Sequence, residues 1–365
     1  MPRKLMPQKG YSASFIVRLI LASACLFAWA APAAARHYYS WEKKPEKTFH
    51  VKARTRLWMA STSAQVRSSM FTPSSWWTPP SDNISRGSTY DFKSMDAPLL
   101  LFSLETQPLR GFSLEFETGD NKFSKGKYYE HDWLHATNQT LFLLNGVVWD
   151  SPQHRDYAKK EMQTSGRARQ YSAAAYLNVY KTGGFSQDEW YELEHSLDLF
   201  VGYSWYETKV RLFNGNKIMS TDFFLPTAPV GPMTGLDSRA RMAWYGWRGG
   251  FRERAVLGKN FFAEARFGFG PTMKYRGENY WNLDTALANP GVRNAATGIL
   301  TEFEISASWK FWKQFRAEAG WMVWAYRAAS GRETYRYADG STWEGTLNRV
   351  KATRKGLYLG LSWQY

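Results

Sequence analysis

The sequence predicts an all-β fold, a transmembrane antiparallel β-barrel of about ten strands with long extracellular loops. Aromatic residues make up 17% of the 365 residues, yet the mean hydropathy is only −0.49. After residue 35 no run of about 18 apolar residues exists, which excludes a helical membrane protein. Instead, apolar and polar residues alternate with period 2, as in strands that have one face on lipid and one on a polar lumen.

The amino-terminal segment has the features of a secretory signal peptide. It combines a positively charged start, an apolar stretch over residues 15–30 and an A-x-A cleavage site at 33–35. We therefore expect a signal peptide, 1–35, followed by an outer-membrane barrel domain, 36–365. The alternative, an uncleaved anchor, is disfavoured because Arg18 interrupts the apolar stretch.

The cysteine count and the net charge limit which bonds and binding partners the mature chain can have. The only cysteine, Cys25, lies within the predicted signal peptide, so the mature chain would have no disulfide and no thiolate metal site. Lys and Arg number 47 against 32 Asp and Glu. For an exported protein, this excess favours anionic membrane partners, namely outer-membrane lipid and lipopolysaccharide, and we expect no nucleic acid.

Three segments show the strand alternation most clearly. In 110–118 and 299–311, aromatic and aliphatic residues alternate with acids and serines, and the same period-2 alternation is present in 315–327. Acids such as Glu302 and Glu304 cannot face lipid, so they are predicted to face a lumen. Ten strands are expected, at about 48–60, 96–106, 110–118, 170–182, 190–208, 238–251, 258–275, 299–311, 315–327 and 350–365.

The connections between these strands alternate in length. Tight turns are expected near 107–108, 183–184, 252–254 and 313, and long connections at 61–95, 119–169, 209–237, 276–298 and 328–349. This is the asymmetry between periplasmic turns and extracellular loops of outer-membrane barrels, and it places both chain ends on the short-turn side. A soluble β-sandwich is the alternative.

The last predicted strand and the lengths of the strands lead to two further predictions. In 350–365, Leu357, Leu359, Leu361, Trp363 and Tyr365 share one face, which predicts a closing strand read by the barrel-assembly machinery. Several predicted strands exceed the 9–11 residues that span a membrane, so the barrel should rise above the bilayer as a stiff collar.

The segments SKGKYYEHDWLH (124–135), VVWDSPQHRDYAKKEM (147–162) and 175–213 resemble, in pattern and order, the omptin family. Omptins are ten-stranded outer-membrane barrels of Gram-negative bacteria that act as surface endopeptidases. The resemblance implies an outer-membrane location, dependence on lipopolysaccharide with no other cofactor, and extracellular peptides or proteins as substrates.

The resemblance also implies a catalytic arrangement, in which two acids face an Asp–His pair and activate a water. Glu130 and Asp132 match the first pair, with Glu in place of the first Asp, and Asp284 is the acid nearest the second. No His follows His195, so the imidazole is missing, and losing one acid–base group typically costs about 10²–10⁴-fold in rate. We therefore expect a proteolytically weak homologue or an altered aspartic-type endopeptidase, and lean towards a non-enzyme.

Three histidines lie in the same predicted loop, at His131, His135 and His154. His131 and His154 are weak substitutes for the missing imidazole, since a loop histidine is more often a solvated polar residue. A metal site built from Glu130, His131, Asp132 and His135 has no recognised spacing, so the site is predicted without a metal.

Other readings remain open. Arginines at 239, 241, 248, 252 and 254 could contact lipopolysaccharide phosphates. They could instead lie on the periplasmic side, or be lumen charges paired with Glu264 and Glu318. A narrow porin or structural barrel is a second functional class. A third is a non-enzymatic adhesin that uses Trp76, Trp77 and the aromatic loop 334–343.

Overall fold

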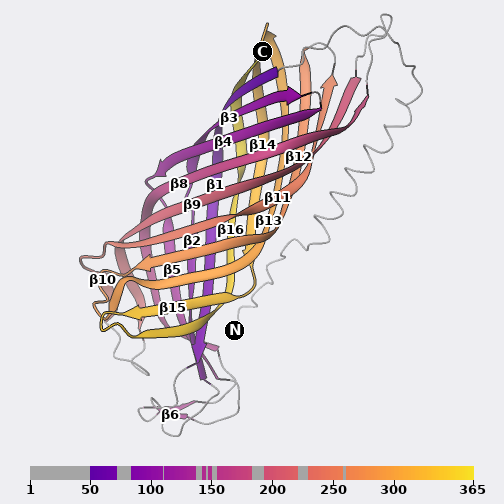
Figure 1. Cartoon of the computed structure of the whole chain (residues 1–365). Helices are drawn as coiled ribbons and strands as arrows, with labels where there is room; N and C mark the ends of the chain where they lie inside the picture. The colour runs from indigo at the N-terminus through magenta and orange to yellow at the C-terminus, as the bar shows by residue number, and fades with distance from the viewer. Residues whose placement is uncertain are drawn as a thin grey trace, which may run out of the picture.

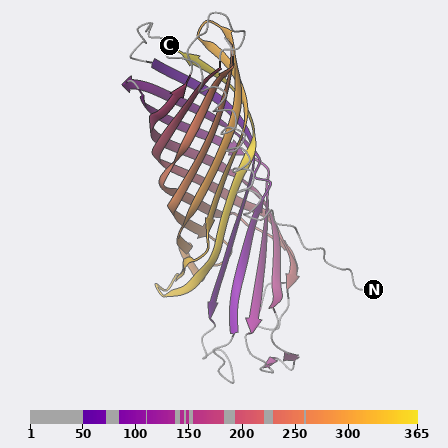
Figure 2. The same cartoon turned by 90° about the vertical axis from the view of Figure 1, so that its right-hand side faces the viewer.

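The computed structural model describes residues 50–71, 84–109, 111–136, 142–144, 147–149, 154–182, 193–220, 229–257 and 260–365. Almost all of these residues lie in long tilted strands that wrap into one barrel (Figures 1 and 2). Within these ranges, no helix is long and apolar enough to cross a membrane. The predicted signal peptide and Trp76–Trp77 lie outside the described residues.

Ten strands form the ring, each antiparallel to its neighbours, and the last pairs with the first. This confirms the predicted all-β barrel. In order around the ring they are β1 (His50–Phe71), β3 (Ala97–Leu109), β4 (Phe112–Phe123), β8 (His154–Thr182), β9 (Leu193–Ser220), β11 (Ser238–Leu257), β12 (Phe261–Tyr280), β13 (Leu287–Trp312), β14 (Phe315–Ala328) and β16 (Thr342–Gln364).

Much of the chain predicted to form long loops is strand in the structure. β2 (Ile84–Lys93) precedes β3 in the chain, and β5 (Lys127–Ala136) follows β4. These two strands pair with each other between β1 and β8 and so extend the β3–β4 hairpin. Likewise β15 (Gly331–Tyr337) extends β14 along β16. We call this part of the barrel, at the end opposite His50 and Tyr365, the collar.

Shorter elements complete the described part of the chain. β10 (Gly231–Met233) pairs with β9, whereas β6 (Phe142–Leu144) and β7 (Val147–Trp149) form a separate two-stranded sheet.

Residues 94–96 and 124–126 interrupt the hairpin without shifting its register. Ser94 adopts a φ of 52°, and Met95 turns its side chain into the interior. Opposite it, a Cβ on Gly126 would lie 2.3 Å from the Thr164 hydroxyl, so only glycine fits. The two paired segments therefore behave as one long hairpin that bends at this level, and the bend carries β5 up into the collar wall.

The predicted strand ends were wrong at one tight turn as well as in the long connections. The turn expected at 252–254 is strand, because Arg252 faces the lumen and bonds to Glu105 and Asp198, and β11 runs on to Leu257. The loop expected at 61–95 is mostly β1 and β2. The turn at Lys313 is as predicted, whereas the turn expected at 183–184 falls among residues 183–192, outside the described residues.

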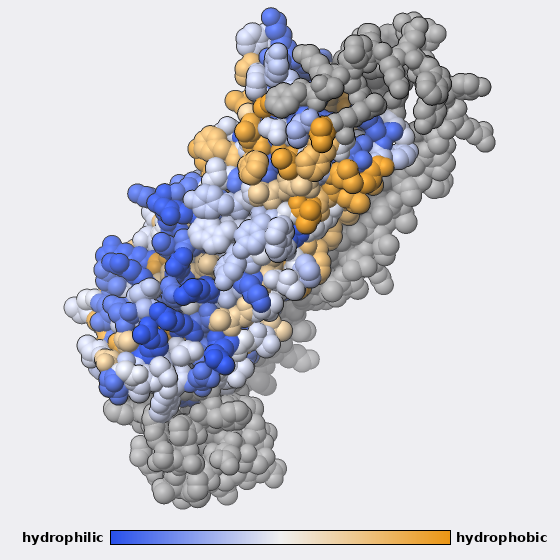
Figure 3. All heavy atoms as spheres, in the orientation of Figure 1, coloured by the Kyte–Doolittle hydropathy of each residue, from blue (hydrophilic) through white to orange (hydrophobic). Residues whose placement is uncertain are grey.

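The outer face of the barrel divides into two zones. Hydrophobic residues gather over the half nearer the carboxyl terminus, and hydrophilic residues cover the collar (Figure 3). In β16, Leu357, Leu359 and Leu361 are each more than half exposed, while Tyr358, between the first two, and Ser362, after the third, are buried. The predicted two-faced closing strand is thus confirmed, and its leucines lie in an apolar band suited to lipid.

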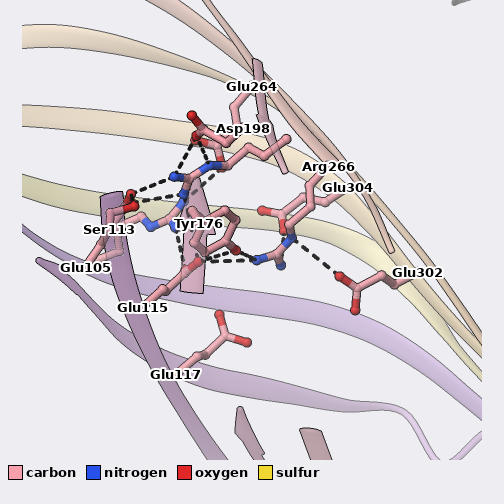
Figure 4. A network of polar contacts seen from close by, with 12 residues as sticks. Glu105, Ser113, Glu115, Glu117, Tyr176, Asp198, Glu264, Arg266, Glu302 and Glu304 are labelled. Atoms are coloured by element: carbon pink, nitrogen blue, oxygen red, sulfur yellow. Dashed lines mark hydrogen bonds and ion pairs between the residues drawn. The ribbon is translucent and has the colours of Figure 1, made fainter. Parts of the chain in front are cut away.

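Inside the apolar band, the lumen is filled with paired charges (Figure 4). Arg252 donates to Glu105 at 2.7 Å and to Asp198 at 2.9 Å, and Arg54 donates to Glu115 at 2.6 Å. Arg266 reaches Glu304 at 2.5 Å. The acids of the alternating segments therefore face the lumen, as predicted.

The same network settles part of the arginine question. Arg248 pairs with Glu302, and Arg254 with Asp198, so these two side chains and Arg252 are lumen charges. Nearer the collar, Trp58, Trp244 and Trp324 fill the interior with their rings. Ion pairs and aromatic rings together occupy the interior between the apolar band and the collar.

Leu359→Arg places a charge in the middle of the apolar band and should destabilise the barrel by about 2–4 kcal/mol in lipid vesicles. The measurement is the denaturant midpoint, followed by the difference in gel migration between folded and boiled protein. Thr353→Arg is the control, since the same strand at this level carries Lys351 and Lys355 and should change by less than about 0.5 kcal/mol. Equal effects of the two changes would contradict the placement of the membrane.

Candidate functional site: the collar cavity

A cavity of about 640 Å³ lies within the collar. β1, β2, β5, β8, β15 and the connection between β12 and β13 all contribute to its wall. Glu130, Asp132 and Asp284, the three acids singled out in the sequence, all line it. The fold therefore brings together residues that are more than 150 positions apart in the chain.

Glu130 and Asp132 point inward because alternate residues of β5 face the cavity. Lys160 of β8 lies 2.6 Å from Glu130 Oε1 and 3.6 Å from Asp132 Oδ2. Tyr128 donates to Glu130 Oε2 at 3.0 Å, and Ser88 donates to Asp132 Oδ1 at 2.6 Å. Three of the four carboxylate oxygens are thus hydrogen-bonded, and the fourth faces the lysine.

Burial raises the pKa of Asp132 to about 6, and the neighbouring charge of Glu130 adds to the rise. Lys160 and the Ser88 hydroxyl act in the opposite direction without cancelling it. The two carboxyl groups therefore hold fewer than two negative charges below about pH 6. A shared proton of this kind is expected when like charges are held close together.

Asp284 lies on the exposed turn between β12 and β13. Its Oδ1 accepts a hydrogen bond from the Ala286 main-chain nitrogen at 3.2 Å, and its main-chain oxygen accepts one from Leu287 at 3.2 Å. The carboxylate thus stabilises its own turn at the rim of the cavity. No histidine is among the described residues that line the cavity.

The structure does not bring His131 to the acid pair. His131 follows Glu130 on β5 and so lies on the opposite, outer face, where its Nδ1 is 3.9 Å from Asp156. The main chain of His154 pairs with that of His135, but the side chains of both lie outside the described residues. Among the described residues, no three His, Cys, Asp or Glu side chains are grouped as a metal site would require.

Sequence reasoning missed Glu333, which is fully buried and lines the cavity. Burial raises the pKa of its carboxyl to about 7, although the Ser68 and Tyr335 hydroxyls beside it lower the pKa. The Asn294 amide, turned with its nitrogen towards the carboxyl, is 3.2 Å from Oε1, and Oε2 has no donor. Alternation over 331–337 was the available signal, but that segment was assigned to a loop.

Aromatic rings line part of the cavity: Tyr90 and Trp281 lie in its wall, and Tyr128 packs against both. The ring centroids of Tyr90, Tyr128 and Trp281 are 6.2, 6.3 and 6.4 Å apart, so the three rings make a nearly equilateral cluster. Tyr335 and Tyr337 of β15 also line the cavity. The site thus combines aromatic rings in its wall with acids on two sides.

Comparisons with known proteins identify the fold. No protein-family model matches the chain, and neither does any curated protein. The outer membrane protease OmpT of Escherichia coli superposes with a TM-score of 0.61 over 89% of this chain and 100% of that one, at 9% identity. The chain has the omptin barrel fold. At this identity the likeness concerns architecture, and it supports an outer-membrane barrel without assigning an activity.

Two other outer-membrane proteins match less well. A channel from Pseudomonas putida F1 gives a TM-score of 0.22 at 8% identity, over 90% of this chain and 100% of that one. A FadL homologue from Pseudomonas aeruginosa gives 0.25 at 9% identity, over 87% and 90%. Neither score is high enough to bear on function.

Glu333→Gln should stabilise the folded protein at high pH and leave it nearly unchanged at low pH. A carboxyl whose pKa rises from 4.5 to about 7 on folding loses stability as the pH rises through that window, and glutamine cannot ionise. The gain should be on the order of 2–3 kcal/mol above pH 8 and vanish near pH 4. Denaturant midpoints at the two pH values measure it.

The control is Glu344→Gln, a matched change of an exposed acid on β16 that pairs with Arg332. It should shift the midpoint by less than about 0.5 kcal/mol at either pH. A gain for Glu333→Gln that does not depend on pH would show that its carboxyl is not the buried titrating group described above.

Proposed function

We propose that this chain is a surface barrel of the Gram-negative outer membrane whose collar cavity binds a ligand, and whose endopeptidase activity is weak or absent. The observation that carries the proposal is the position of Lys160. Its ammonium group binds Glu130 directly and lies beside Asp132, where the omptin resemblance implies a water facing an imidazole.

The geometry explains why such a site would be a poor protease. Lys160 and the Tyr128 and Ser88 hydroxyls already contact the oxygens of Glu130 and Asp132, whereas an activating base needs an oxygen that can accept a proton from the water. The cavity also lacks a described histidine to share the proton, and Asp284 is held to its own turn. Binding needs none of these groups to move a proton.

An altered aspartic-type endopeptidase is the second candidate. The raised pKa of Asp132, with Glu130 beside it, is the pattern of two carboxyl groups sharing one proton. In that case Asp132 would deprotonate a water and Lys160 would stabilise the developing negative charge.

Cleavage of basic peptides by the purified protein with lipopolysaccharide distinguishes the two candidates. The proposal predicts a rate at least about 10²-fold below that of an active omptin, because one acid–base group is missing, and little change in Asp132→Ala. Asp339→Ala, in the tip of the β15–β16 hairpin, is the matched control. Robust cleavage that disappears in Asp132→Ala, and in His131→Ala or His154→Ala, would overturn the proposal.

Lipopolysaccharide is the partner proposed for the outer wall of the collar. Lys209 on β9 lies opposite Arg167 on β8 and opposite Arg241 on β11, and all three side chains are more than 40% exposed. Like charges directly opposite one another repel across strands unless an anion lies between them. Asp120, Glu207 and Glu278 pair with members of this row, and phosphates would add bidentate contacts to its exposed guanidinium groups.

The other two functional classes receive different support. The aromatic segment 334–343, a candidate adhesive loop, is a tight hairpin in which Tyr337 packs on Trp343 at 6.0 Å. That arrangement leaves less free aromatic surface than a loop would. A porin needs an open lumen, whereas here buried Arg56, Arg252 and Arg266 bridge acids across it.

The filled lumen predicts that the protein in a planar bilayer gives no discrete channel openings in concentrated KCl. Pairs of buried charges would have to separate before ions could pass, and each break costs about 3–5 kcal/mol. A known porin in the same bilayer is the positive control. Regular openings of one size would favour the narrow-porin alternative.

A further inference from the structure

We propose that the collar cavity binds a linear aliphatic diamine or polyamine, with one ammonium group at Glu130 and Asp132 and a second at Glu333. This inference names the ligand class of the cavity and rests on the proposed function, that the cavity binds rather than cleaves. It starts from two acidic positions in the cavity wall whose charge is not fully balanced by ion pairs with the described residues.

At the first acidic position, two carboxylates have one described cation within ion-pair distance. Glu130 and Asp132 share the single ammonium of Lys160. Arg86 also lines the cavity, but its guanidinium stacks on the Trp343 ring at 5.9 Å, towards the β15–β16 hairpin. When both carboxyl groups are ionised, this side of the cavity therefore attracts a further cation.

The second acidic position is Glu333, on the opposite side of β1 and β2 from the acid pair. Its carboxyl is fully buried, forms no ion pair with any described residue, and has one oxygen, Oε2, without a hydrogen-bond donor. A buried carboxyl with an unused acceptor is costly unless a ligand donates to it. An ammonium group supplies both the donor and the charge.

The strand register sets the spacing of the two positions. Ser68, whose hydroxyl lies beside Glu333, is the ladder partner of Ser88, and Ser88 is the partner of Asp132. Two strand spacings, roughly 9–10 Å, separate Ser68 from Asp132, and the Glu333 side chain reaches the Ser68 end of this interval from β15, on the far side of β16. One ammonium group cannot contact both positions, whereas two joined by a short methylene chain can.

The aromatic part of the cavity wall suits such a chain. Tyr90 lines the cavity near both Glu130 and Glu333 and packs on Trp281, and Tyr335 lies beside Glu333. Methylene groups pack on aromatic rings, and an ammonium over a ring face gains a further cation–π attraction. An anionic ligand would be repelled, and a single amine would leave one carboxyl unpaired.

Isothermal titration of the detergent-folded protein at pH 8 and low salt tests this, with 1,5-diaminopentane and spermidine as probes and 1-aminopentane as the matched monoamine. The diamine should bind at least about tenfold more tightly than the monoamine, because a second charged hydrogen bond forms. Glu333→Gln should remove most of that difference and leave monoamine binding within about twofold, and Asp132→Asn should also weaken diamine binding about tenfold.

Glu344→Gln is the control, as it removes the same charge from the exposed surface of the collar. Equal affinities for diamine and monoamine in the wild-type chain, or an equal loss in Glu333→Gln and Glu344→Gln, would overturn the inference. The wild-type comparison needs no variant and so does not depend on folding of the mutants. Peptide cleavage is a separate measurement: cleavage would overturn the proposed function, whereas absent diamine preference without cleavage overturns only this inference.

Discussion

Charge pairing inside a closed barrel is the constraint on which the rest of this structure depends. Each strand must present apolar residues to lipid on one face, so its polar residues necessarily converge on the lumen. There, Arg54, Arg252 and Arg266 join acids from β3, β4, β9, β12 and β13. Removing one member would leave a buried charge, at a cost of about 3–5 kcal/mol, so the network favours one arrangement of the ten strands.

The collar follows from the same strands continuing past the apolar band. Once outside the bilayer, the outer face no longer needs lipid-soluble residues, and Lys209, Arg239 and Lys274 replace the leucines and phenylalanines. The inner face changes as well. Instead of closely paired ions, the inner face of the collar forms the cavity. There Lys160 contacts two acids, and no described cation pairs with Glu333. Incomplete pairing of charge is what distinguishes the candidate site from the lumen below it.

The likeness to OmpT is therefore one of framework. Both chains form the same barrel fold, and in this chain Glu130, Asp132 and Asp284 line one cavity. Within that framework a lysine contacts the acids, His131 faces outward, and a buried glutamate enters from β15. A barrel wall tolerates such exchanges because its main-chain hydrogen bonds hold the fold regardless of which side chains face the collar interior.

The sequence by itself determined the barrel, because alternation with period 2 is a local property. Phe303 and Ile305 against Glu302 and Glu304 can be assigned to faces without knowing any partner. It also determined which acids were candidates. It did not determine where the strands end, because continuation past the bilayer depends on cross-strand partners: Arg252 extends β11 only because Glu105 and Asp198 lie opposite it.

The tertiary structure alone decided the character of the site. The sequence offered no reason to connect Lys160 with Asp132, or Glu333 with either, because these residues come from β8, β5 and β15. Lys160 meets the acids where β8 pairs with β5, and Glu333 joins them only when β16 closes on β1. Burial, which raises the pKa of Glu333, is likewise a property of the closed collar. Local pattern thus sets the faces of strands, whereas ring closure sets which charges face one another and which remain unpaired.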